Sequence, residues 1–448
     1  MVGTFAANKL LMSTRISPKP GPAGPQIVQL PEAPLVGRAG RLSPHLPPSL
    51  RVFRHRNFRL FFFGQLISVI GSWMQTTALQ WLVYSITGTQ ASLGLVTFLN
   101  FLPVLLFSLF MGVLVDRFEK RRLLVFTQTW FMILAIVLSI LTFTGLIQYG
   151  QILLLSFLVG IGNALDMPGR QAFYVDIVDR EDLTAAIGLN SALFNGARIV
   201  GPAIAGLVVA NVGEASAFAI NAITFLAVIF ALLLMNLPKP EQGVVRQKGL
   251  KDLNQGLTYL VNEKTILGLV VMVALFSFVG APFSILLPVF AKDILNIGAE
   301  GFGTLLAAQG LGALLGALSL IFFNKSRRTK GQVMLFSRGI MGLAIITLAL
   351  SRQPWLSMVA LVFAGYGFIT QLILTNSLIQ YIVPDALRGR VLSAYTWALG
   401  GFFPLGSLVM GVIGDQIGAP ETALLMGLGC LLLTFINMLL FPEMQKLN

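Results

Sequence analysis

The sequence predicts an all-α polytopic membrane protein, with twelve transmembrane helices in two parallel six-helix halves. Three observations support this fold class: the composition, the spacing of the apolar runs and an internal repeat. Of 448 residues, 56% are hydrophobic and 11% are charged, whereas roughly 25% of the residues in a soluble domain are charged. A soluble fold of this size could not bury so much apolar surface.

Apolar runs follow one another from Phe58 almost to the end of the chain. Crossing a hydrocarbon core of ~30 Å takes about 20 residues at 1.5 Å per residue. The runs lie near 58–84, 91–115, 123–147, 151–172, 184–210 and 215–236, and then near 266–291, 302–323, 331–351, 354–378, 390–414 and 420–441. We therefore expect an N-terminal half over 51–237, a linker over 238–264 and a C-terminal half over 265–441, with tails over 1–50 and 442–448.

The basic residues predict the orientation of the chain. Most lie in short clusters in the first tail and in the loops that follow every second span, and basic loops stay cytoplasmic. We expect a protein of the plasma membrane with both termini and the linker in the cytoplasm. The net charge of +13 then reflects topology, and no nucleic-acid partner is expected. The tail over 1–50 holds nine of the 21 prolines, which predicts disorder.

The residue inventory excludes several kinds of chemistry. Cys430 is the single cysteine and His45 and His55 are the two histidines, so an internal disulfide is impossible and a His/Cys metal site has too few ligands. No G-x-x-x-x-G-K-[ST] loop is present, and no His, Cys or paired-carboxylate constellation indicates an enzyme. We expect no cofactor and no metal. A passive channel would repeat a ring of selectivity residues, which the sequence does not show.

An internal repeat supports two parallel halves. Shifting the chain by 205 residues superposes glycines of helices 4 and 5 on glycines of helices 10 and 11. Duplicated helical transporters place their substrate path at the interface between the repeats. The superposed pairs are Gly160 with Gly365, Gly162 with Gly367, Gly196 with Gly401, Gly201 with Gly406, Gly206 with Gly411 and Gly213 with Gly418.

The loop after the second span carries a motif, GVLVDRFEKRR, over residues 112–122. It resembles the cytoplasmic signature G-x-x-x-D-R-x-G-R-R of the major facilitator superfamily, with Glu119 in place of the second glycine. The resemblance implies a latch that holds one access state, whereas the sequence by itself also allows a simple topology anchor. With the turn before helix 11, the latch candidates are Gly112, Asp116, Arg117, Arg121, Arg122, Arg388 and Arg390.

Further segments resemble the branch of this superfamily that includes the bacterial enterobactin exporter. They are GSWMQ (71–75), WLVY (81–84), LNS (189–191), RIVGP (198–202) and VPDALRGRV (383–391). The glycine-proline pattern around Pro202 is similar to one found in exporters and implies antiport. Together the segments span most of 52–441, and they point to a fold and a transport class without naming a substrate.

Polar residues inside the spans are the candidates for the path, because a charge at the bilayer centre should face protein or water. We expect Arg198 to be the only basic residue deep in a span, either lining a cavity or contacting substrate, or else satisfied by neighbouring carbonyls. Polar stripes on helices 1, 4, 5 and 10 either contact substrate or join helices. The cavity or substrate candidates are Gln65, Ser72, Gln75, Asn163, Asn195, Arg198, Gln371 and Thr375.

Asp166 is the proton-coupling candidate. A carboxylate in a low dielectric can take up a proton near neutral pH, and no histidine lies in any expected span. The alternative is an i,i+4 ion pair with Arg170. The expected function is secondary active transport by alternating access, as a proton-coupled exporter of a small siderophore- or drug-like amphiphile. An importer or facilitator of the same fold is the competing hypothesis. The expected partners are the lipid bilayer, the substrate and protons, with a monomer as the default.

Overall fold

The computed structural model describes residues 48–237, 258–323 and 329–443, and within these ranges every regular element is a helix. The predicted all-α fold is confirmed. The expected disordered tail lies outside the described residues up to position 47, as does most of the expected linker.

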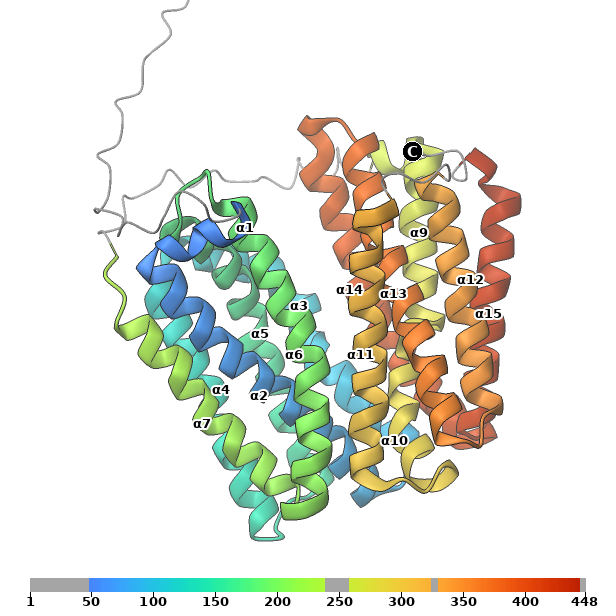
Figure 1. Ribbon diagram of the computed structural model, residues 1–448, viewed down its shortest axis with the longest axis horizontal. Helices are drawn as coiled ribbons and strands as arrows, with labels where there is room; N and C mark the ends of the chain where they lie inside the picture. The colour runs from blue at the N-terminus through green and yellow to red at the C-terminus, as the bar shows by residue number, and fades with distance from the viewer. Residues whose placement is uncertain (1–47, 238–257, 324–328, 444–448) are drawn as a thin grey trace, which may run out of the picture. The chain divides into compact units, whose positions relative to one another are not determined.

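The N half, as we name α1–α7, forms the blue-to-green bundle in Figure 1. After the short α1 (Pro48–Arg51) and the 3₁₀ turn η1 (Val52–Arg54), six long helices follow. They are α2 (Arg56–Thr87), α3 (Gln90–Arg117), α4 (Lys120–Phe143), α5 (Tyr149–Ile177), α6 (Leu183–Val212) and α7 (Glu214–Leu233).

The C half, α9–α15, forms the yellow-to-red bundle. Its first span is interrupted after α9 (Lys264–Val279) by the 3₁₀ segment η2 (Ala281–Leu286), α10 (Leu287–Val289) and the π-helical η3 (Phe290–Ile294). Pro282 and Pro288 lack an amide donor, which explains why one expected helix over 266–291 is broken. The later helices are α11 (Gly298–Phe323), α12 (Lys330–Leu350), α13 (Pro354–Ile382), α14 (Asp385–Ile417) and α15 (Ala419–Leu440).

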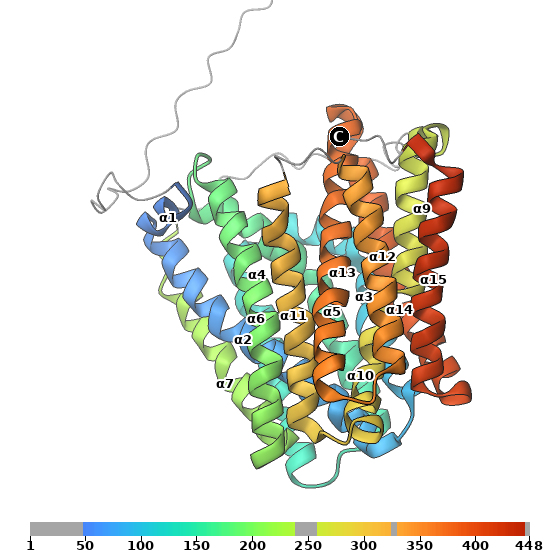
Figure 2. The ribbon, with the colours of Figure 1, turned by 45° about the vertical axis from the view of Figure 1, so that its right-hand side comes forward.

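Eleven helical segments in the described ranges are long and apolar enough to cross a membrane. The remaining predicted span corresponds to α2, whose 32 residues reach roughly 48 Å at 1.5 Å per residue. Its polar stripe, which includes Gln65 and Gln75, lowers its mean hydropathy below that of the other eleven segments. Successive helices run in opposite directions. We call the end at which α2 begins and α15 ends the proximal end, and the end at which α2 ends and α11 begins the distal end (Figures 1 and 2).

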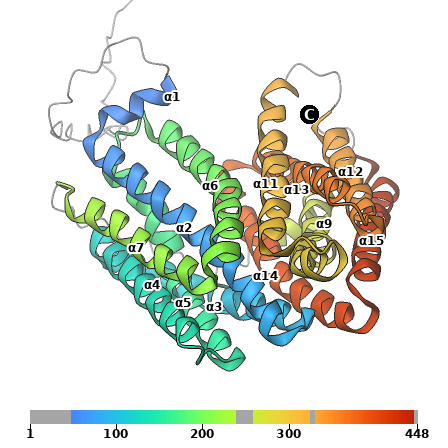
Figure 3. The same cartoon turned by 60° about the horizontal axis from the view of Figure 1, so that its bottom comes forward.

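Two seams join the halves. The α3–α14 seam and the α6–α11 seam are each a close pairing of one helix from either half, and α6 and α11 lie side by side in Figures 1 and 3. Glycines permit this approach: a Cβ on Gly303 would lie 2.5 Å from the Pro202 carbonyl oxygen, and one on Gly411 would lie 2.6 Å from the Gln90 carbonyl oxygen. The backbones of the paired helices are therefore in close contact at both seams.

Candidate functional site

Arg198 lies at the border between the halves. Its guanidinium carbon is 5.6 Å from the centre of the Trp73 ring in α2 and 5.7 Å from the centre of the Phe368 ring in α13. The residue is partly buried, and no hydrogen bond or ion pair to its guanidinium occurs among the described residues. A cation between two aromatic faces is stabilised by the ring quadrupoles, and its donors stay available for a ligand.

The position of Arg198 follows from the α6–α11 seam. Gly310 of α11 packs against the backbone of α6, where a Cβ would lie 3.1 Å from the Arg198 carbonyl oxygen. The side chain therefore leaves α6 at the seam and reaches one helix of each half. The sequence allowed a structural arginine that donates hydrogen bonds to neighbouring carbonyls. Among the described residues, Arg198 makes no such hydrogen bond.

Asp166 lies in a buried polar cluster of the N half. The side chain is 3% exposed, and its Oδ1 accepts from Thr127 Oγ1 at 2.8 Å and from Gln128 Nε2 at 2.7 Å. Its Oδ2 forms an ion pair with Arg170. The Arg170 guanidinium also donates to Gln65 Oε1 and lies 5.6 Å from the Phe194 ring centre. The i,i+4 pair named as the alternative is present, in a site that holds the carboxylate from α4 and α5.

The expectation that Arg198 is the only basic residue deep in a span is wrong, because the C half contains a second buried cation. Arg338 of α12 is 1% exposed, and its Nε donates to Gln371 Oε1 of α13 at 2.9 Å. Its guanidinium carbon lies 5.8 Å from the Phe276 ring centre. No carboxylate pairs with it among the described residues. The signal was available, because an arginine eight residues after Lys330 falls inside an apolar run.

The other predicted path residues separate into buried and partly buried groups. Gln65, Gln371 and Thr375 are at most 1% exposed inside their own half. Thr375 donates to the Gln371 carbonyl oxygen at 2.7 Å and also contacts Met334 Sδ. These three side chains join helices of one bundle. Those that are only partly buried are Ser72, Gln75, Asn163 and Asn195.

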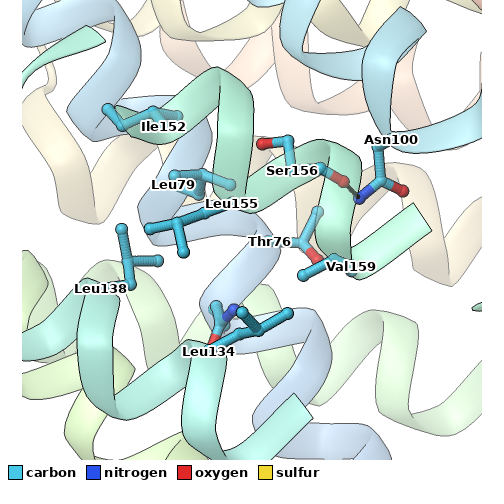
Figure 4. Close-up of a pocket in the computed structure, with 10 residues that line it drawn as sticks. Thr76, Leu79, Asn100, Leu134, Leu138, Ile152, Leu155, Ser156 and Val159 are labelled. Atoms are coloured by element: carbon cyan, nitrogen blue, oxygen red, sulfur yellow. Dashed lines mark hydrogen bonds between the residues drawn. The ribbon is translucent and has the colours of Figure 1, made fainter. Parts of the chain in front are cut away.

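A small cavity lies within the N half, between α2, α3, α4 and α5. Its volume for water-sized molecules is about 60 Å³. Figure 4 shows Leu79 and Leu138 on one side of it and Ser156 and Asn100 on the other. Asn100 Nδ2 donates to the Ser156 carbonyl oxygen at 3.4 Å. The Ser156 hydroxyl has no partner among the described residues. This cavity fits water rather than a siderophore- or drug-sized molecule.

The proximal loops pair within their own halves. Arg121 donates to the Leu233 carbonyl oxygen at 2.6 Å, Arg122 pairs with Glu119 at 2.6 Å, and Arg388 pairs with Asp385 at 2.5 Å. Arg117 ends α3 as an exposed residue, and Arg390 is partly buried on α14. The side chains of Gly112 and Asp116 lie outside the described part of the structure, so the latch stays a prediction.

One group of described residues has the proximity that a metal site needs. His55, Asp179 and Asp182 offer ligand atoms within 4.8 Å of one another at the proximal end. However, Arg54 pairs with Asp182 at 2.9 Å and with Asp179 at 3.3 Å, and His55 Nε2 lies 2.8 Å from Asp182 Oδ2. Arg54 and His55 already contact both carboxylates, so the cluster ties the end of η1 to the turn before α6.

Comparison with known families identifies the class of protein. A profile of the transmembrane secretion effector family matches residues 48–448. The chain belongs to this family. The resemblance to the major facilitator superfamily and to its enterobactin-exporter-like branch is therefore confirmed. Members of the family are transporters and not enzymes.

Three relatives cover nearly the whole chain. It is 28% identical to the staphyloferrin A transporter of Staphylococcus aureus, over 87% of this chain and 98% of the relative. It is 24% identical to macrolide efflux protein A of Streptococcus pyogenes, over 84% and 94%. It is 26% identical to the enterobactin exporter of Escherichia coli, over 88% and 93%. The chain is thus similar to transporters of siderophores and drugs.

Solved structures show the same fold at low identity. A POT family transporter in complex with 5-aminolevulinic acid aligns with a TM-score of 0.70 at 14% identity, over 87% of this chain and 97% of the other. A D-xylose–proton symporter aligns with a TM-score of 0.68 at 14% identity, over 86% and 98%. The chain is a multi-span membrane transporter of the major facilitator fold.

Proposed function

We propose that this transporter exports a small amphiphilic molecule, siderophore- or drug-like, by alternating access. The three relatives above, named for siderophores and macrolides, favour this substrate class. The observation that carries the proposal is the position of Arg198, between Trp73 of the N half and Phe368 of the C half. A site that touches both halves can change its contacts when the halves move relative to each other.

The chemistry around Arg198 favours a substrate with an anionic or electron-rich group beside an aromatic or apolar surface. The guanidinium supplies charge-assisted donors for the first, and the two rings supply stacking area for the second. Removing one such charged hydrogen bond costs about 1.5–3 kcal/mol, or roughly 10- to 100-fold in affinity.

A panel of siderophores, macrolides and other amphiphiles, screened for thermal stabilisation of the purified protein, tests this proposal. A bound ligand raises apparent stability by mass action. Arg198→Gln should weaken the stabilising ligand at least ~10-fold, since a charge-assisted bond is lost. Arg352→Gln is the matched control, because Arg352 is an exposed cation at the distal end. Equal affinity in both variants would contradict a ligand contact at Arg198.

We propose a proton gradient as the driving force, with Asp166 as the carrier. Protonation would neutralise the Asp166 carboxylate and so break its ion pair with Arg170. The freed guanidinium already contacts Gln65 of α2. A single proton would then change the contacts among α2, α4 and α5.

The orientation, the latch and the direction belong to the same proposal. We place the proximal end in the cytoplasm of a cell with a plasma membrane, on the basis of its basic loops. Asp116→Asn should leave insertion intact yet cut transport several-fold. An importer or facilitator of the same fold is the competing function. Substrate uptake into inverted vesicles on acidifying their lumen would support export, whereas uptake only into right-side-out vesicles would support import.

A further inference from the structure

We infer that Asp415 and Gln90 form a reciprocal cap across the α3–α14 seam, which holds the distal end closed. The inference rests on the proposed alternating access. It concerns two residues that the sequence reasoning did not consider.

The N-terminus of α3 is capped by the other half of the protein. Thr89, its own N-cap residue, makes no capping hydrogen bond, and its hydroxyl instead lies 2.6 Å from Ser92 Oγ. No acidic residue lies in the first turn of α3. Asp415 of α14 supplies both the capping hydrogen bonds and the negative charge. Its Oδ1 accepts from the Gln90 amide at 2.5 Å, and its Oδ2 accepts from the Ala91 amide at 3.0 Å. A carboxylate at this position satisfies free amides and the helix dipole together.

A second hydrogen bond runs from α3 to α14. Gln90 Nε2 donates to the Gly414 carbonyl oxygen of α14 at 3.0 Å, and Gln90 is 6% exposed. The C-terminal turn of α14 thus receives a donor from α3, while α3 receives an acceptor from α14. Gly411 allows the approach, because a Cβ there would lie 2.6 Å from the Gln90 carbonyl oxygen and 3.0 Å from the Ala91 Cα.

Further contacts at the distal end act in the same direction. Tyr84 of α2 donates to Asp293 of η3, and the Lys292 ammonium lies 5.5 Å from the Tyr84 ring centre. Trp81 stacks on Phe302 of α11, with ring centres 5.9 Å apart. Opening the distal end would have to break these contacts and expose the first amides of α3.

Among the described residues, no side chain of α6 caps the N-terminus of α11 in the same way. Ala210 occupies the position in α6 that Asp415 occupies in α14, at the repeat offset of 205 residues. The first turn of α11 carries its own acidic residue, Glu300. The reciprocal cap is therefore particular to α3–α14, and its loss should shift the balance of access states rather than unfold the protein.

Spin labels on two distal positions measure this balance directly. Cysteines at Thr144 and Leu350, both exposed and in opposite halves, carry the labels, and the wild-type chain with its fully buried Cys430 is the blank. Loss of a helix cap typically costs 0.5–2 kcal/mol, or roughly 2- to 30-fold. Asp415→Asn should raise the ratio of distal-open to distal-closed molecules by about three- to tenfold within that range.

Two variants make the outcome decisive. Gly411→Ala should raise the same ratio without changing any charge, since its Cβ would meet the Gln90 carbonyl. Glu214→Gln, which removes a distal carboxylate at the start of α7, should leave the ratio unchanged. If the labels report two distal distances and Asp415→Asn leaves their populations unchanged, the cap is overturned but alternating access is not. A single distance in every variant would overturn both.

Discussion

Each half has a buried pair of polar residues at corresponding positions, and the charges of the two pairs differ. Gln128 and Arg338 lie eight residues after the first residue of α4 and of α12, and Asp166 and Gln371 are related by the repeat offset of 205 residues. In each half the first residue donates to the second, at 2.7 Å from Gln128 and 2.9 Å from Arg338. The two pairs thus share a hydrogen-bond arrangement, but only the pair in the N half contains a carboxylate.

The difference teaches where a switch can be located. The N half holds an acid and a base that neutralise each other, so taking up a proton changes the balance of charge there. At the corresponding position the C half holds a guanidinium against a neutral amide and an aromatic ring, and an arginine that already carries its proton cannot take up another. Under the proposed proton coupling, the N half is therefore the half in which protonation would act.

The largest effect is expected from separating the buried ion pair. Arg170→Met leaves the Asp166 carboxylate, 3% exposed, without its counter-charge. Removing one partner of a buried pair costs about 3–5 kcal/mol, so the melting temperature should fall strongly. In the double variant Asp166→Asn with Arg170→Met, most of that loss should be regained. Equal melting temperatures for the single and double variants would show that the stranded charge is not the cause.

A medium effect, equal in both halves, is expected from the glycines that pack the repeated helices. A Cβ on Gly160 would overlap the Asn100 carbonyl oxygen, and one on Gly365 would overlap the Gln309 carbonyl oxygen. Overpacking of this kind costs about 1–3 kcal/mol. Gly160→Ala and Gly365→Ala should lower thermal stability by similar amounts. Gly196→Ala is the control, since a Cβ there would meet nothing within 4 Å.

The smallest effect is expected from copying the N half into the C half. Arg338→Gln places at this position the residue found at Gln128 and keeps a donor for Gln371. Replacing a buried charge by a neutral group that fits is often neutral or stabilising, so stability should change by less than about 1 kcal/mol. A loss as large as that of Arg170→Met would mean that Arg338 has an anionic partner in the protein.

The sequence predicted the helices better than the site. Apolar runs are long, so the spans and the repeat could be located, and the broken stretch after α9 differs only because two prolines remove amide donors there. The Asp166–Arg170 pair could be proposed because both residues lie on one helix. In contrast, contacts between separate helices, such as Arg338 with Gln371 or Asp415 with the α3 amides, depend on tertiary packing that no local pattern encodes.

The central claim is that proton coupling depends on Asp166 of the N half. The most direct test measures two modes of transport in the same inverted vesicles: accumulation driven by a pH gradient and exchange of substrate without a gradient. Asp166→Asn should abolish the first and retain the second, while Arg338→Gln should retain both. Gradient-driven accumulation at wild-type rates in Asp166→Asn would contradict the claim.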